Sequence, residues 1–288
     1  MNDYPKISII TPNLNGERYL ERCIRSVLDQ DYPNLEYIII DGGSTDKSPS
    51  IISKYLNRIS YYESQSDDGM YFAIQKGFDL CSGEVMGWLN SDDRYWQNSL
   101  HTVAEIFSCH PDVQWLQGYP VVIDDSDRIV HHRSHAFSKL SFYLKEYRNG
   151  LFIQQESTFW KRSLWNKAGG SLSTRFNYAA DFELWMRFFN HEPLFITDAV
   201  LGAFRMHRGD QISKIHYDKY LEECDQIINS YCFLLSQRDK KNLDLVIKLK
   251  WFEKQIPFIY RSLHFDTLVK KILGSPNKIK FNFSTFEF

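Results

Sequence analysis

Short apolar runs alternate with helical patterns along the first ninety residues. Apolar runs typical of buried strands occupy residues 6–11, 35–40, 59–62 and 85–89. Apolar residues at helical spacing lie between them, at residues 16–28, 48–56 and 69–80. Strands and helices that alternate in this way form right-handed β-α-β units around a mostly parallel sheet. The sequence therefore predicts an α/β fold.

The rest of the chain is predicted to be mixed at first and helical later. Strand patterns occupy residues 113–118 and 120–124, and a helical pattern covers residues 182–190. After about residue 215 the pattern changes to long helical runs. We therefore predict one domain at residues 1–215 and a helical, basic C-terminal extension at residues 216–288.

Charge is distributed unevenly between these two parts. The formal net charge is only −2, which gives no reason to expect a nucleic-acid partner. From Arg238 to the C-terminus there are 11 Lys and Arg against 5 Asp and Glu, so the preceding residues are acidic. Residues 248–254 (KLKWFEK) mix basic and aromatic side chains. This mixture is typical of helices at an anionic membrane surface, and equally of a helical extension packed on the main domain with its lysines in solvent.

The cysteine content favours a reducing compartment. The five cysteines are odd in number and form no C-x-x-C pair, so neither a disulfide framework nor a zinc cluster is expected. The N-terminus runs directly into a strand and does not resemble a signal peptide. No run of about 18 apolar residues is present. We expect a cytoplasmic protein, whose basic extension is the candidate for peripheral contact with the inner face of the membrane.

Acidic residues lie beyond the ends of three predicted strands. They are Asp41, Asp68 and the pair Asp92–Asp93. In open α/β sheets, ligands bind outside the carboxyl ends of the strands. Two adjacent carboxylates stay ionised only with good solvation or a bound cation, and carboxylate oxygens suit Mg²⁺ or Mn²⁺. Residues 90–93 (NSDD) are therefore interpreted as a metal and diphosphate site, with a solvated turn as the alternative.

Several motifs occur in an order that resembles the inverting glycosyltransferases of family 2, which have the GT-A fold. The segments that carry the resemblance are residues 9–16 (IITPNLNG), 41–46 (DGGSTD), 66–77 (SDDGMYFAIQKG), 83–93 (GEVMGWLNSDD), 157–160 (STFW), 169–170 (GG) and 180–187 (ADFELWMR). The chain departs from the family at Leu14, where an aromatic residue is common, and at Phe72 and Gln75, where Asp and Asn are common.

The resemblance implies a mostly parallel, nucleotide-binding sheet of the GT-A type, flanked by helices. It also implies a hexosyltransferase-class enzyme that uses a nucleotide-sugar, with a UDP-sugar favoured. The residues implied in nucleotide-sugar binding are Thr11, Pro12 and Asp41 at the nucleobase, Asp68 at the nucleotide, and Asp92 at the ribose or sugar. Asp93 would bind Mn²⁺ or Mg²⁺, with His207 as a further metal or diphosphate ligand.

The implied reaction is a single displacement that inverts the anomeric carbon. It needs a carboxylate that takes the acceptor proton as the hydroxyl attacks. Asp181 is the candidate general base, because it opens a predicted helix whose dipole would hold it ionised. Glu156 and Trp160 are expected either to border the acceptor or to fill the core. The acceptor would be a sugar or lipid-linked saccharide in polysaccharide, O-antigen, capsule or glycolipid assembly.

Other functions predict different sequence features or behaviour. A non-catalytic nucleotide-sugar-binding or scaffold protein with the same fold would bind nucleotide without turnover. A sugar-phosphate nucleotidyltransferase would need a Gly-rich, Arg-containing loop after the first strand, where this chain has residues 12–17 (PNLNGE). An NAD-dependent oxidoreductase would need G-x-G-x-x-G at the same place. The residues after the first strand therefore argue against both of these enzyme classes.

Overall fold

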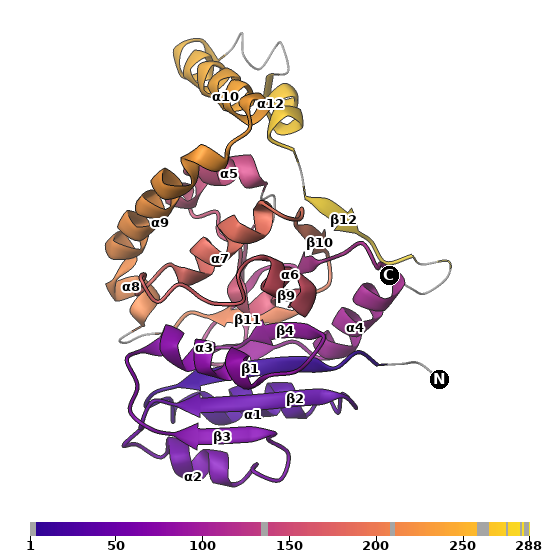
Figure 1. Cartoon of the computed structure of the whole chain (residues 1–288), viewed down its shortest axis with the longest axis vertical. Coiled ribbons are helices and arrows are strands. Elements are labelled where there is room, and N and C mark those ends of the chain that lie inside the picture. Colours follow the sequence, from indigo (N-terminus) through magenta and orange to yellow (C-terminus); the bar gives the residue numbers. More distant parts are fainter. Residues whose placement is uncertain are drawn as a thin grey trace.

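The strands of this protein form two sheets, and helices cover both faces of the larger one (Figure 1). The computed structural model describes residues 4–133, 138–207, 211–257, 265–274, 276–282, 284 and 288. The larger sheet has eight strands in the order β12-β10-β6-β9-β4-β1-β2-β3, and the smaller sheet has four in the order β5-β11-β7-β8. The predicted α/β class is confirmed.

The larger sheet is mostly parallel. Only β9 runs antiparallel to its neighbours, β4 and β6, among the described strands of this sheet. Its strands are β1 (Ile7–Asn13), β2 (Leu35–Asp41), β3 (Tyr61–Ser64), β4 (Val85–Trp88), β6 (Trp115–Gln117), β9 (Thr158–Lys161), β10 (Phe195–Thr197) and β12 (Asn277–Ile279). The smaller sheet contains β5 (Arg94–Tyr95), β7 (Val121–Ile123), β8 (Ile129–His132) and β11 (Gly202–Arg205).

The helices of the N-terminal part agree with the predicted ones, and further helices follow in the C-terminal part. They are α1 (Leu20–Leu28), α2 (Ser48–Ser53), α3 (Met70–Leu80), α4 (Ser99–Cys109), α5 (Lys139–Tyr143), α6 (Arg162–Lys167), α7 (Ala180–Phe189), α8 (Ile212–Ile215), α9 (Tyr217–Tyr231), α10 (Gln237–Gln255) and α12 (Phe265–Leu273). Three 3₁₀ turns are η1 (Glu146–Asn149), η2 (Gln155–Ser157) and η3 (Cys232–Leu234). The first helix begins at Leu20 rather than Gly16, because residues 16–19 form a turn in which the Gly16 carbonyl accepts the Tyr19 amide at 3.0 Å.

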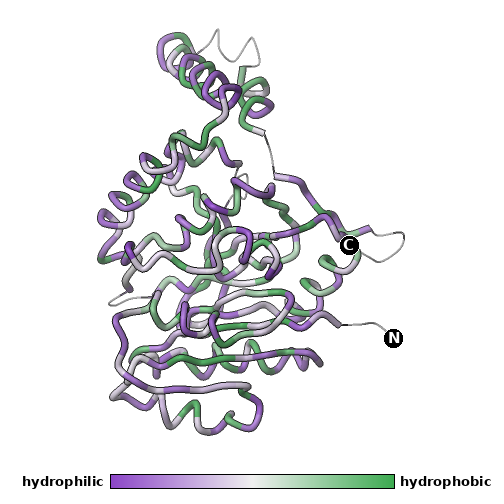
Figure 2. Tube along the Cα trace, viewed as in Figure 1, coloured by the Kyte–Doolittle hydropathy of each residue, from purple (hydrophilic) through white to green (hydrophobic). Residues whose placement is uncertain are grey.

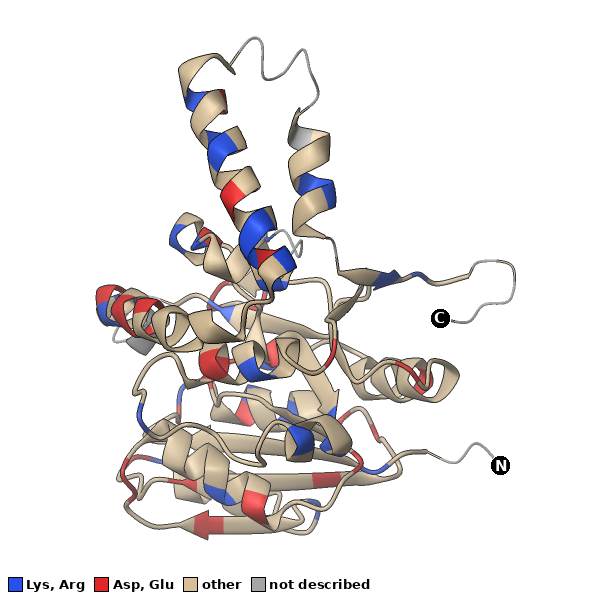
Figure 3. Cartoon of the chain, turned by 45° about the horizontal axis from the view of Figure 1, so that its top comes forward, with Lys and Arg blue, Asp and Glu red and all other residues tan. Residues whose placement is uncertain are grey.

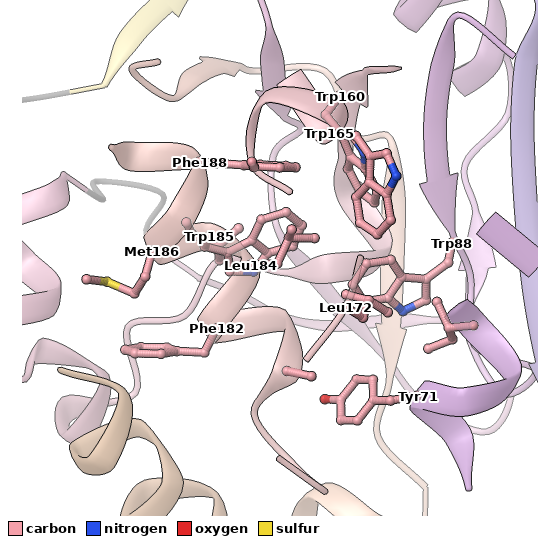
Figure 4. Close-up of a cluster of buried hydrophobic side chains, with 14 of the residues drawn as sticks. Tyr71, Trp88, Trp160, Trp165, Leu172, Phe182, Leu184, Trp185, Met186 and Phe188 are labelled. Atoms are coloured by element: carbon pink, nitrogen blue, oxygen red, sulfur yellow. The ribbon is translucent and has the colours of Figure 1, made fainter. Parts of the chain in front are cut away.

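The core lies on both faces of the larger sheet because neighbouring residues of a strand point to opposite sides. Ile7 and Ile9 of β1 belong to one cluster of buried residues, and Ile10 belongs to the other. The second cluster is rich in aromatic rings from several strands and helices (Figure 4). Its fully buried tryptophans are Trp88, Trp115, Trp160 and Trp185. The high aromatic content thus serves packing, and Trp160 is a core residue rather than an acceptor contact.

The chain after residue 215 returns to the main body. Helix α9 buries Cys224, Ile227 and Ile228 in the core, and β12 pairs with β10 at one end of the larger sheet. Only α10 and α12 stand away from the rest of the molecule (Figure 1). The domain boundary at residue 215 stays a prediction, although α9 and β12 complete the core and sheet that precede it. None of the described helices is long and apolar enough to cross a membrane.

Helix α3 packs so closely on β1 that glycine is required at the contact. A Cβ atom on Gly77 would lie 2.5 Å from Cγ2 of Ile10. Alanine is favoured over glycine in helices by about 1 kcal/mol, but forcing a methyl group into a packed core costs about 1–3 kcal/mol. We therefore expect Gly77→Ala to lower the free energy of unfolding by about 1 kcal/mol net, measured by urea denaturation.

The matched control for this substitution is Asp79→Ala, at an exposed position of the same helix. We expect it to change the free energy of unfolding by less than about 0.5 kcal/mol. A Gly77→Ala variant as stable as the parent would contradict the tight packing of α3 on β1.

Candidate active site

The carboxyl ends of β1, β2 and β4 meet at one edge of the larger sheet. Strand β1 lies between β2 and β4 and is parallel to both, and Asn13 is in register with Asp41. Residues 90–93 follow β4 after a single intervening residue. Polar segments that are far apart in the sequence are therefore neighbours at this edge.

Asp41 is a buried carboxylate that connects the carboxyl ends of β1, β2 and β3. Its Oδ1 accepts hydrogen bonds from Asn13 Nδ2 at 2.6 Å and from Ser44 Oγ at 2.6 Å. Its Oδ2 accepts from the Ser44 amide at 2.9 Å and from Ser64 Oγ at 2.5 Å. Burial acts to raise the pKa of Asp41, but the hydrogen bonds from these donors outweigh it and lower the pKa. Protein donors thus fill the four acceptor positions of an ionised carboxylate, so a nucleobase would have to displace one of them.

A cavity of about 330 Å³ lies beside Asp41 and α3. Asp41 and Asp68, two of the residues predicted to bind nucleotide, both line it. Phe72, one of the departures from the family motif, also lines it and is 39% exposed. The other acidic side chains of the lining are Glu63, Asp67 and Asp79. Among the described residues, the lining has one cation, Lys76, which is paired with Glu63. This excess of carboxylates suits a base or ribose hydroxyls, which donate hydrogen bonds, better than it suits a phosphate.

Thr11 and Pro12 do not contribute side chains to this cavity. The Thr11 side chain is fully buried, and its Oγ1 lies 3.0 Å from the Tyr37 hydroxyl. Pro12 is also buried. Leu14, by contrast, is 62% exposed just after β1. The side chain of Thr11 therefore serves the core, and any contact of residues 11 and 12 with a nucleobase would come from the backbone.

Asp93 is the last residue of the loop that connects β4 and β5, and it is buried. Only 1% of the residue is exposed, and Oδ1 accepts the backbone amide of Arg205 at 2.7 Å. Burial raises the pKa of Asp93 well above its usual range, and the charges of Asp92 and Glu156 add to the effect. The other oxygen, Oδ2, is buried and has no hydrogen-bond partner among the described residues. The metal-binding role predicted for Asp93 stays a prediction.

Asp92 and His207 form the more accessible pair. Asp92 Oδ2 and His207 Nε2 are 3.4 Å apart, and 33% of the Asp92 side chain and 14% of the His207 side chain are exposed. A carboxylate oxygen and an imidazole nitrogen so placed can share a divalent cation. No group of three or more His, Cys, Asp or Glu side chains gathers for metal binding among the described residues. Two protein ligands fit a Mg²⁺ or Mn²⁺ that takes its other oxygens from a diphosphate and water.

Arg205 connects this loop to distant parts of the chain. Its side chain is fully buried, and Nε donates to the Asp92 carbonyl at 2.7 Å. One terminal nitrogen donates to the Asp124 carbonyl at 2.8 Å, and the other lies 2.5 Å from Oδ1 of Asp127. The guanidinium also lies 4.8 Å from the centre of the Tyr19 ring. A single cation thus joins the loop after β4, the turn between β7 and β8, and the residue before α1.

Tyr19 completes this arrangement around His207. The Tyr19 and His207 rings lie 5.1 Å apart, and the Tyr19 hydroxyl donates to Oδ1 of Asp125. No motif in the sequence indicated that Arg205 and Tyr19 contact the residues of the site. The available signal was an arginine in the short apolar strand at residues 202–205 (GAFR), since a charged residue in a buried strand requires partners.

Asp181 lies in the first turn of α7, as predicted, but in a less polar environment than expected. Burial raises its pKa to about 6, against the opposing effects of hydrogen bonds from the Phe182 amide and the Tyr71 hydroxyl. Tyr71 Oη lies 3.4 Å from Oδ1 of Asp181 and donates to the Tyr178 carbonyl at 2.9 Å. The helix dipole therefore does not dominate, and the pKa lies where a carboxylate can both accept and release a proton near neutral pH.

The loop before Asp181 is fixed by Glu223 of α9. The two carboxylate oxygens of Glu223 accept the backbone amides of Asn177, Tyr178 and Ala179, each at 2.9 Å. Helix α9 lies in the segment predicted to be an extension, so no local pattern connected it to the candidate base. Glu223 also acts to raise the pKa of Asp181.

Glu156 is almost completely buried in η2. Burial raises its pKa to about 7, although the Gln154 side-chain amide donates to its Oε1. The charge of Asp92 also acts to raise the pKa of Glu156. Because only 3% of Glu156 is exposed, its direct contact with an acceptor sugar is not supported.

The sequence is similar to known glycosyltransferases. Residues 8–178 match the model of the family described as glycosyl transferase family 2. An uncharacterized glycosyltransferase of Rickettsia typhi is 28% identical over 208 residues, which cover 70% of this chain and 64% of that protein. The putative teichuronic acid biosynthesis glycosyltransferase TuaG of Bacillus subtilis is 30% identical over 133 residues, which cover 44% of this chain and 53% of that protein. The chain thus spans less than two thirds of the length of these relatives.

Solved structures share the fold at low sequence identity. TarS residues 1–349 of S. aureus, in complex with UDP-GlcNAc, superpose with a TM-score of 0.67 and 17% identity, over 88% of this chain and 73% of that one. The mannosyltransferase PcManGT of Pyrobaculum calidifontis, in complex with GDP-Man and Mn²⁺, gives a TM-score of 0.53 and 14% identity, over 94% of this chain and 86% of that one. These similarities confirm the predicted GT-A fold.

The buried guanidinium of Arg205 is expected to be important for stability. Asp127 keeps Arg22 and Arg94 as partners when the Arg205 side chain is removed. The removal leaves the Asp92 and Asp124 carbonyls without the guanidinium as a donor and opens a cavity in a buried region. We therefore expect Arg205→Ala to lower the free energy of unfolding by about 2–4 kcal/mol in urea denaturation.

Arg94→Ala is the matched control, because Arg94 pairs with the same Asp127 at 3.1 Å but is 31% exposed. A partly exposed ion pair contributes about 1 kcal/mol or less. Equal, small losses in the two variants would show that the Arg205 network does not hold these loops together.

Proposed function

Because the chain belongs to glycosyl transferase family 2, we propose that it transfers a sugar from a nucleotide-sugar, with a UDP-sugar favoured, to an acceptor hydroxyl. The observation that carries this proposal is the Asp92–His207 pair at the sheet edge where Asp41 and Asp68 line a cavity. The two proteins of the same fold solved with UDP-GlcNAc and with GDP-Man support a nucleotide-sugar as the donor.

The donor would bind with its nucleoside end towards the cavity. The acceptors around Asp68 would receive hydrogen bonds from the base or ribose, and Phe72 offers a partly exposed ring for stacking. The acidic lining would keep the diphosphate out of the cavity. This division leaves the diphosphate for the loop at residues 90–93, where a cation can offset its charge.

Asp92 and His207 would hold the Mn²⁺ or Mg²⁺, in place of the role first predicted for Asp93. The pair is partly exposed and its ligand atoms converge, whereas one oxygen of Asp93 is bonded to the Arg205 amide. A divalent cation at this position supplies positive charge to the departing nucleoside diphosphate. Asp93 would then act in the protein interior, where it joins the loop to β11.

Asp181 would act as the general base. In an inverting transfer, the acceptor oxygen forms a bond to the anomeric carbon while the bond from that carbon to the diphosphate oxygen breaks. The acceptor proton passes to a carboxylate oxygen of Asp181, and no covalent enzyme intermediate forms. A pKa of about 6 supports this role, because the group is mostly ionised at neutral pH yet basic enough to take a proton.

The acceptor would be a sugar or a lipid-linked saccharide in the assembly of a polysaccharide, O-antigen, capsule or glycolipid. The similarity to a putative teichuronic acid biosynthesis glycosyltransferase supports a cell-envelope polysaccharide. We further propose a main domain at residues 1–215 and a C-terminal extension that contacts the membrane through its exposed helices, in a protein located on the inner face of that membrane.

The transferase assignment is tested with purified protein, Mn²⁺ and a panel of nucleotide-sugars. Release of a nucleoside diphosphate in the presence of acceptor supports it, and thermal stabilisation by UDP, GDP or dTDP identifies the base. Nucleotide binding without release under any donor or acceptor condition would support a non-catalytic binding protein instead.

The metal assignment predicts different effects for the two neighbouring aspartates. Asp92→Asn and His207→Ala should each weaken Mn²⁺ binding by roughly 100-fold or more, because each removes a ligand atom. Asp93→Asn should leave Mn²⁺ affinity within about threefold, because Asp93 is almost completely buried and an amide of the same shape can still accept the Arg205 backbone amide. Isothermal titration with Mn²⁺ and UDP measures the affinities. A loss in Asp93→Asn as large as that in Asp92→Asn would restore Asp93 as the ligand.

The general-base assignment predicts a pH dependence of turnover. Because the pKa of Asp181 is raised to about 6, kcat should fall as the pH drops through 6 and Asp181 becomes protonated. Asp181→Asn should lower kcat by about 10²–10⁴-fold and leave UDP affinity unchanged.

Tyr71→Phe provides a sharper control for the same assignment. The Tyr71 hydroxyl acts to lower the pKa of Asp181, so its removal should move the acidic limb of the kcat profile to higher pH with kcat at the plateau nearly unchanged. An Asp181→Asn enzyme with full activity, or a Tyr71→Phe profile that does not move, would exclude Asp181 as the base.

A further inference from the structure

The pair formed by α10 and α12 stands apart from the two sheets (Figure 1). The pair buries Leu243 and Val246 of α10 and Val269 of α12, and Phe252 and Phe265 approach to 6.0 Å between ring centres. The inner side of α10 is attached to the main body, because Lys250 is paired with Glu146 of η1. The orientation of α10 is therefore set by contacts on one side of the helix.

A neighbouring side of α10, about 100° around the helix axis from this inner side, is exposed and carries apolar, basic and acidic residues. We call this side the outer face of α10, which consists of Lys240, Asp244, Ile247, Trp251 and Lys254. These residues follow one another at alternating intervals of four and three, so they share one side of the helix. All five are exposed, and the exposed fractions of Ile247 and Trp251 are 57% and 62%. Figure 2 shows green and purple segments that alternate along α10, because the helix carries both apolar and charged residues.

Positive charge is concentrated on the same two helices. Within α10 and α12 there are eight Lys and Arg against four Asp and Glu. The basic residues are visible as blue bands along both helices (Figure 3). The residues before Arg238 are acidic overall, since the whole chain carries only −2. An anionic surface would thus attract α10 and α12 and repel the main body, which would orient the molecule.

We propose that the outer face of α10 binds the surface of an anionic lipid bilayer. The indole of Trp251 combines a large apolar ring with one N–H donor, a combination favoured in the interfacial layer. Ile247 lies one turn away and adds apolar area. Lys240 and Lys254, at the two ends of the face, would reach lipid phosphates with their ammonium groups while their carbon chains stay near the apolar layer.

A lipid surface fits this face better than a protein partner does. The centres of protein interfaces are depleted in lysine, whereas this face has Lys254 one turn from Trp251 and a second lysine, Lys240, at its other end. A membrane interface uses this combination, because apolar insertion and attraction to anionic headgroups act together. Binding does not depend on the proposed transferase activity; if that activity is correct, the contact would bring the enzyme to lipid-linked acceptors.

Flotation of the full chain with vesicles tests the proposal. The protein should float with phosphatidylcholine vesicles that contain phosphatidylglycerol and not with phosphatidylcholine alone, and high salt should reduce the floated fraction. The double variant Trp251→Ala and Ile247→Ser should lower the partition coefficient by at least about tenfold. Each of Lys240→Gln and Lys254→Gln should lower it by about fivefold.

Phe233→Ser is the matched control, since Phe233 in η3 is 75% exposed but lies outside the outer face of α10. Its flotation should equal that of the parent. Unchanged circular dichroism and UDP affinity in every variant separate a loss of lipid binding from misfolding and from failure of the donor site.

Two results would overturn the proposal. The first is equal flotation of the parent and the double variant with anionic vesicles. The second is self-association in analytical ultracentrifugation that the double variant abolishes while flotation is unchanged, because the face would then serve a second copy of this chain.

Discussion

The arrangement of the loop at residues 90–93 depends on the hydrogen bonds and the ion pair of the Arg205 guanidinium. A fully buried cation must be matched by partners, because an unpaired charge in the protein interior is far more costly than one in water. Arg205 meets this requirement with the Asp92 carbonyl, the β7–β8 turn and the Tyr19 ring. Segments more than a hundred residues apart in the sequence are thereby held in one arrangement, which also sets the distance between Asp92 and His207.

Four aspartates near the strand ends and α7 have different properties because their surroundings differ. Asp41 is kept ionised by protein donors, Asp93 is driven towards its neutral form by burial, and Asp181 has a pKa of about 6. Asp92 is the one of these four with an imidazole beside it and a third of its side chain exposed. Chemically identical groups thus differ in their pKa and exposure, since desolvation and hydrogen bonding shift the pKa in opposite directions.

Acidic and basic side chains are concentrated in different parts of the fold. The acidic cavity and carboxylate-rich loop would repel a nucleoside diphosphate unless a divalent cation intervenes, so donor binding and metal binding are expected to be coupled. The basic α10 and α12, which Figure 3 shows with blue bands, would require no such mediator for an anionic surface, because six of their seven lysines are exposed. Because the acidic cavity and the basic helices α10 and α12 lie in different parts of the fold, one chain carries both kinds of charged surface.

The sequence by itself determined the α/β class, the early strands and helices, and the segments that meet at the carboxyl edge of the sheet. These follow from local hydrophobic periodicity and from the parallel order of β-α-β units, which do not depend on distant contacts. It also predicted that Asp181 opens a helix and that Asp41 and Asp68 lie at the same edge of the sheet. Tertiary structure decided that Thr11 and Trp160 are core residues, that β12 joins the sheet, and that Asp92 rather than Asp93 approaches His207. Those outcomes depend on burial and on partners such as Arg205 and Glu223, which are supplied by segments far away in the chain.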